Sequence, residues 1–327
     1  MGFIQCIHDP CIFVGIYPDF LTSPIYVGCY VDDFVYSSTS GSVEQRFETG
    51  LAERVKADFM GTVSWFLGIF FERTVTRTRI SAHLSPEGFV NELLDRHHLV
   101  DGNPSPSPYR SGFVIDRIPI DSESASAEFV TQYQSLIGGL TWLHISTRPE
   151  IGVAHKLLCT HLQSPSSSHM TAAKHVLCYL AGSAARGIRF TSQGSHGKLT
   201  GYYDYPIACT TKATAYCDAN WGPQDASQPT ESNKLAHMTI DECRSLQGMI
   251  IVRMGGAVAW KSYREKKVSR SSCESEIHAT DECCKLTQRV SASLWRTSRC
   301  PTCNLQANCT MTTADVSTEP KGGPTEK

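Results

Sequence analysis

Two adjacent carboxylates, Asp32 and Asp33, stand between short runs of apolar and β-branched residues in the stretch CYVDDFVYSS. Two like charges this close repel each other and cost stability unless a cation neutralises them. Oxygen ligands at a rigid turn suit a hard ion such as Mg²⁺, and such ions organise in-line phosphoryl transfer. The pair therefore predicts a magnesium site for phosphoryl-transfer chemistry. The alternative is an ordinary Asp-Asp turn on a solvated hairpin.

The segments around this pair predict the element that would present it. PIYVGCYV and FVYSS have the composition of two short strands, and they meet at Asp32 and Asp33, where a tight hairpin turn accepts Asp. Apolar residues then recur every four positions, which predicts a helix with one apolar face. These residues are Val43, Phe47, Leu51, Val55 and Phe59.

A second strand pair and a helix follow. SWFLGIFFERTV and TRTRISAHL are strand-like, and SPEGFVNELLDRHHL predicts a helix with Ser85 as its N-cap and Pro86 at its first position. His97 and His98, at the end of this helix, are expected to act as C-terminal capping charges rather than as metal ligands.

The whole chain predicts an α+β protein of two or three domains, because 327 residues exceed one compact core. Pro, Ser and small residues mark a linker, two amphipathic stretches predict connecting helices, and a period of two then predicts strands before a long helix from about Cys273. In that scheme GMIIVRMGGAVAW is a hairpin. The predicted division is residues 1–100, a linker at 101–128, helices at 129–186, a second α+β domain at 187–299 and a frayed tail at 300–327.

Charge and cysteine content narrow the setting. The formal charge of −2 gives no global reason to bind nucleic acid, but ten Lys and Arg outnumber five Asp and Glu between Arg253 and Arg299. Lys266, Lys267 and Arg270 are the centre of this basic segment, and a solvated helix surface is the alternative. Fourteen scattered cysteines without an export signal, a lipid-anchor signal or a membrane span predict an intracellular protein with reduced thiols. Cytoplasmic and nuclear residence are not distinguished.

Several motifs, in order, resemble copia-type retrotransposon Pol polyproteins. YVDDF resembles the Tyr-x-Asp-Asp box of reverse transcriptases, and MGFIQCIHDPCIFV, SWFLGIFFER and YQSLIGGLTWLHISTRPEIGVA are similar to family stretches around and after that box. HMTAAKHVLCYLAGSAARGIRF is similar to the connecting helix and strand. CDANW, GGAVAWKS and SRSSCESEIHAT resemble the ribonuclease H domain. The resemblance covers residues 1 to about 290.

This resemblance implies a partial polymerase palm, a helical connection and a truncated ribonuclease H-like α/β domain. It implies that Asp32 and Asp33 bind metal, with Tyr30 near the primer end. The family's third palm carboxylate lies on an earlier strand, upstream of this chain. RNA-directed DNA polymerase activity is therefore expected to be absent or marginal in this chain alone.

The resemblance also implies a second acidic site. Asp218 at a strand end and Glu276 match the metal-binding carboxylates of the ribonuclease H domain, and the alternative for Glu276 is a solvated helix residue. Glu274 is expected to be structural, because Ser271 and Glu274 have the spacing of a capping box. The family's later Asp-Asn pair does not occur after Glu276, and Asp315 matches poorly, so this site is expected to be incomplete.

The implied cofactor is Mg²⁺, and the implied partners are an RNA/DNA template-primer or hybrid duplex and other polyprotein parts. Tyr30, Lys266, Lys267 and Arg270 are the predicted nucleic-acid contacts. Two further hypotheses stay open, a stand-alone ribonuclease H-like nuclease and a non-catalytic decayed element product. Zinc binding is not expected, because a second ligand pair to complement Cys300 and Cys303 is absent, although Cys309 and His278 are also available.

Overall fold

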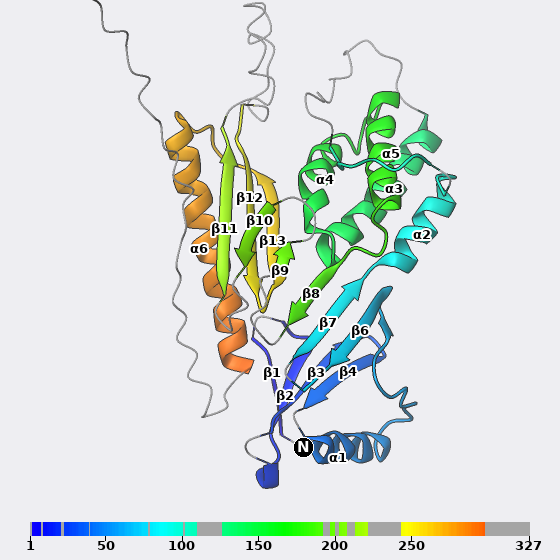
Figure 1. The fold of residues 1–327 in the computed structure, drawn as a ribbon, viewed down its shortest axis with the longest axis vertical. Coiled ribbons are helices and arrows are strands. Elements are labelled where there is room, and N and C mark those ends of the chain that lie inside the picture. The colour runs from blue at the N-terminus through cyan, green and yellow to red at the C-terminus, as the bar shows by residue number, and fades with distance from the viewer. Residues whose placement is uncertain are drawn as a thin grey trace, which may run out of the picture.

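The structure is a computed structural model. It describes residues 2–7, 9–20, 23–38, 40–77, 79–100, 102–109, 126–191, 197–199, 203–207, 213–221 and 243–297. In this part of the chain the paired strands are all antiparallel, and helices and sheets alternate along the sequence, which confirms a mixed α+β fold. Figure 1 shows a helical layer beside the sheet flanked by α6, with two further sheets below.

The first sheet has the order β1–β2–β3–β4 and carries the predicted acidic hairpin. Alternation along β3 buries Ile25 and Val27 against Val43 and Phe47 of α1. The predicted helix is too long, because α1 ends at Ala52, and Val55 and Phe59 are exposed beyond it. The elements are β1 (Phe3–Gln5), β2 (Ile12–Gly15), the 3-10 helix η1 (Pro18–Phe20), β3 (Ile25–Tyr30), β4 (Asp33–Ser38) and α1 (Gly41–Ala52).

The second sheet joins segments that lie a hundred residues apart. β5 (Trp65–Phe66), β6 (Ile69–Val75) and β7 (Ile80–Ser85) form the predicted strand pair with its short leading strand, and β8 (Ile188–Thr191) pairs with β7. A Cβ atom at Gly187 would lie 1.8 Å from the Leu84 carbonyl oxygen, so only glycine allows β8 to enter the sheet there.

The helical layer holds the largest core of the described chain. It consists of α2 (Glu87–Arg96), α3 (Ala127–Ser146), the 3-10 helix η2 (Pro149–Ile151), α4 (Gly152–Cys159) and α5 (Ser167–Ala181). Gly182 is the C-cap residue of α5. The N-cap of α2 is Pro86 rather than Ser85, and the Ser85 hydroxyl oxygen instead accepts a hydrogen bond from the Glu87 amide at 3.3 Å.

The third sheet has the order β11–β12–β13, with α6 packed along β11. The strands are β11 (Thr214–Asn220), β12 (Leu246–Arg253) and β13 (Gly256–Arg264), and α6 spans Ser272–Thr297. Met254 and Gly255 both have positive φ, at 52° and 79°, which is the backbone of a tight two-residue turn, so the predicted hairpin is confirmed. β9 (Gly197–Leu199) and β10 (Tyr203–Ile207) pair separately.

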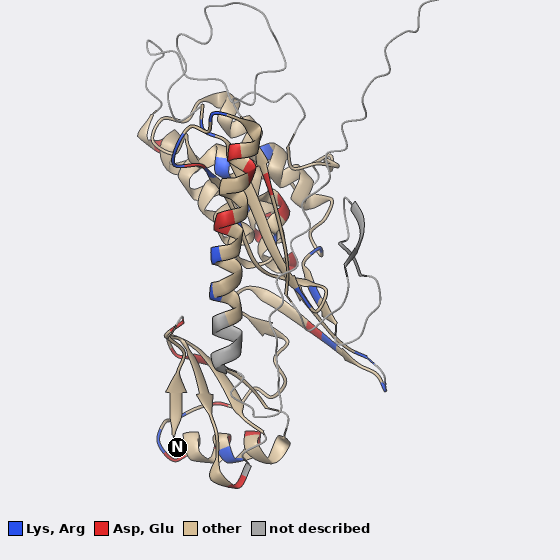
Figure 2. Cartoon of the chain, turned by 90° about the vertical axis from the view of Figure 1, so that its left-hand side faces the viewer, with Lys and Arg blue, Asp and Glu red and all other residues tan. Residues whose placement is uncertain are grey.

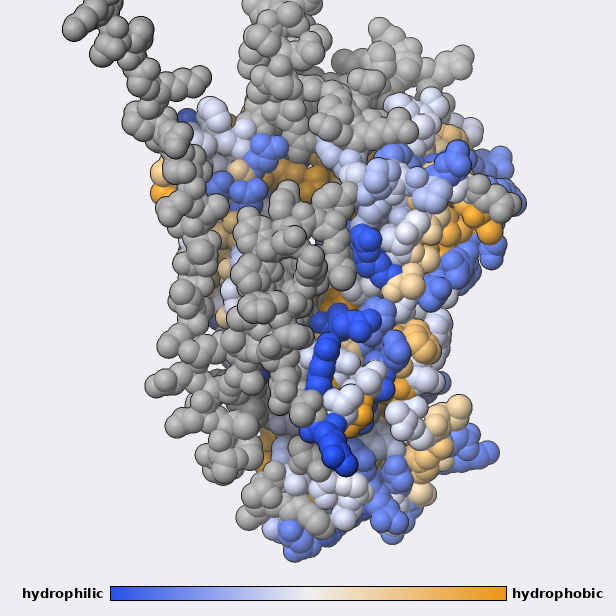
Figure 3. Space-filling model, viewed as in Figure 1, coloured by the Kyte–Doolittle hydropathy of each residue, from blue (hydrophilic) through white to orange (hydrophobic). Residues whose placement is uncertain are grey.

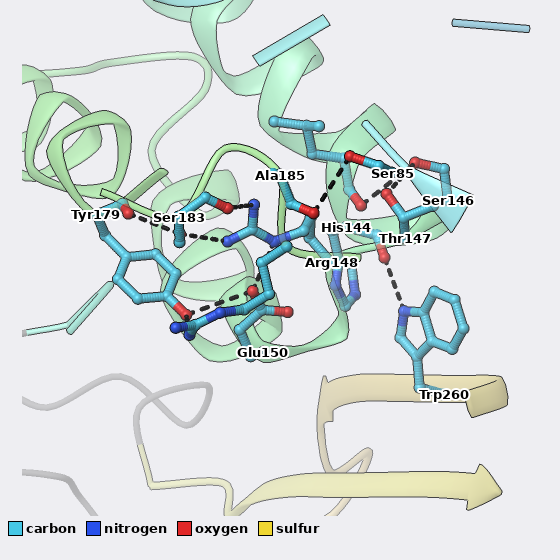
Figure 4. Close-up of polar contacts among 12 residues, drawn as sticks. Ser85, His144, Ser146, Thr147, Arg148, Glu150, Tyr179, Ser183, Ala185 and Trp260 are labelled. Carbon is cyan, nitrogen blue, oxygen red and sulfur yellow. Dashed lines mark hydrogen bonds and ion pairs between the residues drawn. The ribbon is translucent and has the colours of Figure 1, made fainter. Parts of the chain in front are cut away.

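A buried arginine joins two helix ends within the helical layer. The Arg148 side chain is fully buried, and its Nε lies 2.6 Å from the Glu150 carboxylate. Its Nη1 and Nη2 donate to the backbone oxygen and the hydroxyl of Ser183, at 2.9 and 2.7 Å. Figure 4 shows this network with the Trp260 indole of β13, which donates to the His144 carbonyl at 2.7 Å. Arg148 therefore connects the ends of α3 and α5 close to β13.

Two elements take partners across the predicted domain bounds. α2 belongs to the first predicted region, but its Val90, Leu93 and Leu94 lie in the core of the helical layer. β8 belongs to the last predicted region and pairs with β7 of the first. The division itself stays a prediction, and much of the predicted linker and the tail from 300 lie outside the described residues.

Candidate functional site

The first candidate site is the acidic tip, which we define as Val31, Asp32 and Asp33. Tyr30 pairs with Asp33 across the β3–β4 hairpin, so the predicted hairpin is confirmed and the turn falls at Val31 and Asp32. Val31 is 85% exposed and has a φ of 56°. A β-branched residue in this left-handed region is a strained outlier, and such strain is concentrated at functional sites.

The tip presents its carboxylates to solvent. Asp32 and Asp33 are exposed, and Tyr30 beside them is also exposed. Within the described parts of the chain, no three His, Cys, Asp or Glu side chains gather in a way that could hold a metal ion. The tip therefore supplies two hard oxygen donors on one open turn, which fits Mg²⁺ only where further ligands come from elsewhere.

The second candidate site is the acidic pair, Asp218 and Glu276. Asp218 lies on β11, which is the edge strand of its described sheet, and Glu276 lies in the second turn of α6. α6 packs along β11, and the Glu276 Oε1 accepts a hydrogen bond from the Ala219 amide at 3.3 Å. The Glu276 carboxylate thus lies against the backbone of Ala219, the residue that follows Asp218 on β11.

Electrostatics link the two members of this pair. Burial raises the pKa of Glu276, and the Asp218 charge raises it further, while the hydrogen bond from the Ala219 amide acts in the opposite direction. Repulsion of a partly buried carboxylate by a neighbouring one is a cost that a bound cation relieves. Both donors are carboxylate oxygens, the ligand type that Mg²⁺ prefers, so the residues present fit that ion.

The start of α6 is fixed by its own cap, which keeps Glu276 in place. The Ser271 hydroxyl accepts a hydrogen bond from the Glu274 amide at 3.1 Å, as predicted. The Glu274 carboxylate accepts from the Arg270 amide at 2.7 Å, one residue before the predicted Ser271 amide. Glu274 is therefore structural, as expected.

The predicted basic contacts lie in the loop that leads into α6. We call Lys266, Lys267 and Arg270 the basic loop, and all three are exposed. Ser269 inside this loop donates to the buried Glu265 carboxylate at 2.7 and 2.8 Å. The loop is therefore anchored close to the first turns of α6.

Trp221 is a site residue that sequence reasoning missed. It follows β11 directly, it is 49% exposed, and its indole Nε1 donates to the Ser269 carbonyl at 3.0 Å. An exposed aromatic ring beside basic residues is the usual combination in single-strand and duplex binding surfaces. The signal available in the sequence was an aromatic residue directly after a strand that carries Asp218 near its end.

Other predicted residues have different outcomes. His278 contacts the Glu265 carboxylate, while Cys300, Cys303, Cys309 and Asp315 lie outside the described residues.

His97 is the C-cap residue of α2, at the helix end where the sequence placed it. Burial first, and then the neighbouring Arg96, lower the pKa of His97, which weakens the charged capping role expected of it. His98 instead has a φ of 54°, the left-handed conformation in which helices often end.

Comparison with known proteins gives a consistent but distant relationship. The chain is 26% identical over 282 residues to the retrovirus-related Pol polyprotein from transposon RE1 of Arabidopsis thaliana, covering 85% of this chain and 16% of that protein. It is 24% identical over 282 residues to the Pol polyprotein from transposon TNT 1-94 of Nicotiana tabacum, covering 86% and 19%. It is a distant relative of copia-type Pol polyproteins.

A third relative is shorter. The putative transposon Ty5-1 protein of Saccharomyces cerevisiae is 25% identical over 252 residues, which cover 75% of this chain and 68% of that protein. The chain spans less than a fifth of the two polyproteins. No protein-family model matches it, and no solved structure matches it. None of the described helices combines the length and the apolar character needed to cross a bilayer.

Proposed function

We propose that this chain is the part of a copia-type Pol polyprotein that joins the end of a polymerase palm to a ribonuclease H-like domain. We further propose that its own chemistry is Mg²⁺-dependent cleavage of the RNA strand of an RNA–DNA hybrid, at Asp218 and Glu276. The observation that carries this proposal is the hydrogen bond from the Ala219 amide to Glu276, which holds the glutamate beside Asp218.

The acidic pair suits phosphodiester chemistry for a physical reason. Mg²⁺ is usually held by one or two carboxylates together with substrate phosphates, so two protein carboxylates leave room for a nucleic-acid backbone. When bound, the ion would polarise a phosphoryl oxygen and lower the pKa of a bound water. Asp218 is exposed and open to that backbone, while the Ala219 amide orients Glu276.

The surroundings of the pair supply contacts for a duplex. The basic loop would bind phosphates by charge, and Trp221 would lie against a sugar or base. The Trp221 indole is already fixed by the Ser269 carbonyl, so little side-chain freedom remains to be lost on binding.

We propose a more limited role for the polymerase half. Its resemblance is to RNA-directed DNA polymerase, but Asp32 and Asp33 stand on an open turn and would need ligands from other polyprotein parts. In this chain alone the polymerase half would contact a template-primer through Tyr30 and the acidic tip. Its polymerase activity would be absent or marginal. An intracellular location also stays a prediction.

The test is cleavage of a labelled RNA–DNA hybrid in Mg²⁺. Asp218→Asn and Glu276→Gln should each reduce the rate by more than about 100-fold, because even residues that only support metal ligands are worth 10–100-fold. Asp281→Asn is the matched control, since Asp281 is an exposed acid on the same helix that pairs with Lys285.

The outcomes separate the hypotheses. Unchanged cleavage in both pair variants, or an equal loss in Asp281→Asn, would contradict the proposed site. A wild-type chain that binds the hybrid without cleaving it would favour the non-catalytic element product instead.

A further inference from the structure

The end of the β6–β7 hairpin projects from the body of the protein. Figure 2 shows this hairpin extending outward, with Lys- and Arg-coloured segments toward its end. Glu72 to Arg77 are exposed, and so are Arg79 and Ile80 on the return strand. Val75 and Ile80, which pair across the hairpin, are 61% and 44% exposed. A strand pair that is open on both faces has no core to explain its composition.

The charge of this hairpin is strongly positive. We define the basic hairpin as Arg73, Arg77 and Arg79, and Glu72 is the single acid in the sequence from Ile69 to Ser85. The Glu72 carboxylate points toward His83, whose Nδ1 lies 3.8 Å away. In the described part of the chain Arg73 and Arg77 make no ion pair, so their guanidinium groups are available to a partner.

The turn of the hairpin is held rigidly. The Thr76 amide donates to the Arg79 carbonyl at 2.8 Å, and the Arg79 amide donates to the Thr76 hydroxyl at 3.0 Å. The same hydroxyl donates to the Arg79 carbonyl at 3.0 Å. These bonds fix the backbone that carries Arg77, which lowers the ordering cost when a ligand binds.

Positive charge continues onto the neighbouring strand. Arg79 donates through its Nε to the Thr191 hydroxyl at 3.1 Å, which lays this side chain toward β8. Arg189 of β8 is exposed opposite His83 and, after burial, lowers the pKa of that histidine. Figure 3 shows strongly hydrophilic residues following one another over this region of the molecule.

The chemistry of this surface selects its partner. Its cations are arginines, whose planar guanidinium groups match phosphate oxygens with two parallel hydrogen bonds. A two-stranded β-ribbon fits the major groove of B-form DNA, and its exposed arginines can also bind phosphates along the backbone of other duplexes. Paired exposed Val75 and Ile80 can lie against sugar edges.

We propose that the basic hairpin is a second nucleic-acid contact. It binds the phosphate backbone of the duplex at a place separate from the acidic pair. The inference concerns a separate surface from the proposed nuclease site, but it takes the same RNA–DNA hybrid as its ligand. Its role is to position the duplex, and it takes no part in bond cleavage.

The test measures binding of an RNA–DNA hybrid by fluorescence anisotropy over a series of salt concentrations, in EDTA so that no cleavage occurs. Removing two phosphate contacts should lower the salt slope by about 2 in the Arg73→Gln/Arg77→Gln double variant. The control is Arg46→Gln/Arg96→Gln, which makes the same charge change at arginines already paired with Asp19 and Glu92 and should keep the slope.

Three results of the hybrid-binding experiment would overturn the inference. They are an unchanged slope in the hairpin variant, an equal change in both double variants, and a wild-type chain without salt-dependent duplex binding. Loss of binding to phosphatidylserine vesicles, with hybrid binding kept, would assign the hairpin to a membrane surface and also overturn it. Asp218→Asn separates this test from the proposed function, because it should abolish cleavage while leaving the salt slope unchanged.

Discussion

The acidic tip and the acidic pair place two carboxylates together in opposite ways. At the tip, Asp32 and Asp33 are neighbours in the chain, and a hairpin turn exposes them both. In the pair, exposed Asp218 comes from a strand and partly buried Glu276 comes from a helix, and the amide of Ala219, the residue after Asp218, donates a hydrogen bond to Glu276. The tip is easily recognised as a sequence motif, but its surroundings do little to the carboxylates. The pair is hard to recognise in the sequence, and its surroundings couple the two side chains.

This difference shows what a bound cation would gain at each place. Exposed carboxylates are already stabilised by water, so an ion bound at the tip would replace that solvation with little net gain in free energy. Glu276 is partly buried, and its pKa is raised first by that burial and further by the Asp218 charge, so a bound ion would relieve part of this cost. We therefore propose the pair, rather than the tip, as the metal site of this chain.

The helical layer lies between the two regions along the chain, and breaking it should have the largest effect. Arg148→Met removes the buried charge that holds Glu150 and Ser183, so the free energy of unfolding should fall by about 3 kcal/mol or more. Urea denaturation measures this loss. Arg96→Met, at an exposed ion pair, should cost less than about 1 kcal/mol. Equal losses in both variants would show that the Arg148 contacts do not hold the ends of α3 and α5 together.

Acid should destabilise the helical layer. Burial is the main cause that lowers the pKa of His155 to about 4, with His144 and Lys156 adding to it, and burial likewise lowers the pKa of His161 to about 4. Between pH 6.5 and 4 the unfolded chain binds more protons than the folded chain, so stability should fall as the pH decreases through this range. Thermal melting at several pH values measures the fall.

The matched variant for this effect is His155→Gln, which keeps a partner for the Thr141 hydroxyl, now 2.7 Å from His155 Nε2. Melting temperatures of this variant should depend less on pH in the same range. An unchanged pH dependence would mean that His155 is not held neutral by the fold.

Removing the Glu276 charge should have a smaller effect on stability, and this effect distinguishes the acidic pair from the tip. Because its pKa is raised in the folded state, ionised Glu276 costs stability at neutral pH. Glu276→Gln should therefore stabilise the fold by a few tenths to about 1 kcal/mol at pH 7 while it removes cleavage. The gain should disappear at a pH low enough to protonate the glutamate. Destabilisation at pH 7 would contradict the electrostatic account of the pair.

The smallest effect is expected at the tip. Asp32→Asn with Asp33→Asn should change the free energy of unfolding by no more than about 0.5 kcal/mol, because both side chains are exposed. Chemical denaturation measures this change. A clear gain in stability would show that the two aspartates repel each other as strongly as the acidic pair, and the contrast between the regions would fail.

Local patterns predicted much of the fold. The hairpin at Asp32 and Asp33, the Met254–Gly255 turn and the long helix α6 all depend on neighbouring residues, such as turn formers and caps, and each is confirmed. The predicted extension of α1 to Phe59 failed because periodicity alone does not show where a helix loses the sheet that covers it.

Long-range contacts could not be predicted in the same way. The pairing of β8 with β7, the burial of Arg148 and the contact of Trp221 with Ser269 all join residues that are distant in the chain. The Arg residues of the basic hairpin were visible in the sequence, but their exposure on both faces was not. Asp218 and Glu276 were predicted through a family resemblance, and the contact between their elements comes from the packing of α6 on β11.

The most direct test of the central claim is an NMR titration of the Glu276 carboxyl group in the wild-type chain and in Asp218→Asn. If the two carboxylates share one site, the pKa of Glu276 should fall when the Asp218 charge is removed. Mg²⁺ should lower the pKa in the wild-type chain more than in the variant. A Glu276 titration that is identical in both proteins, with and without Mg²⁺, would contradict the account.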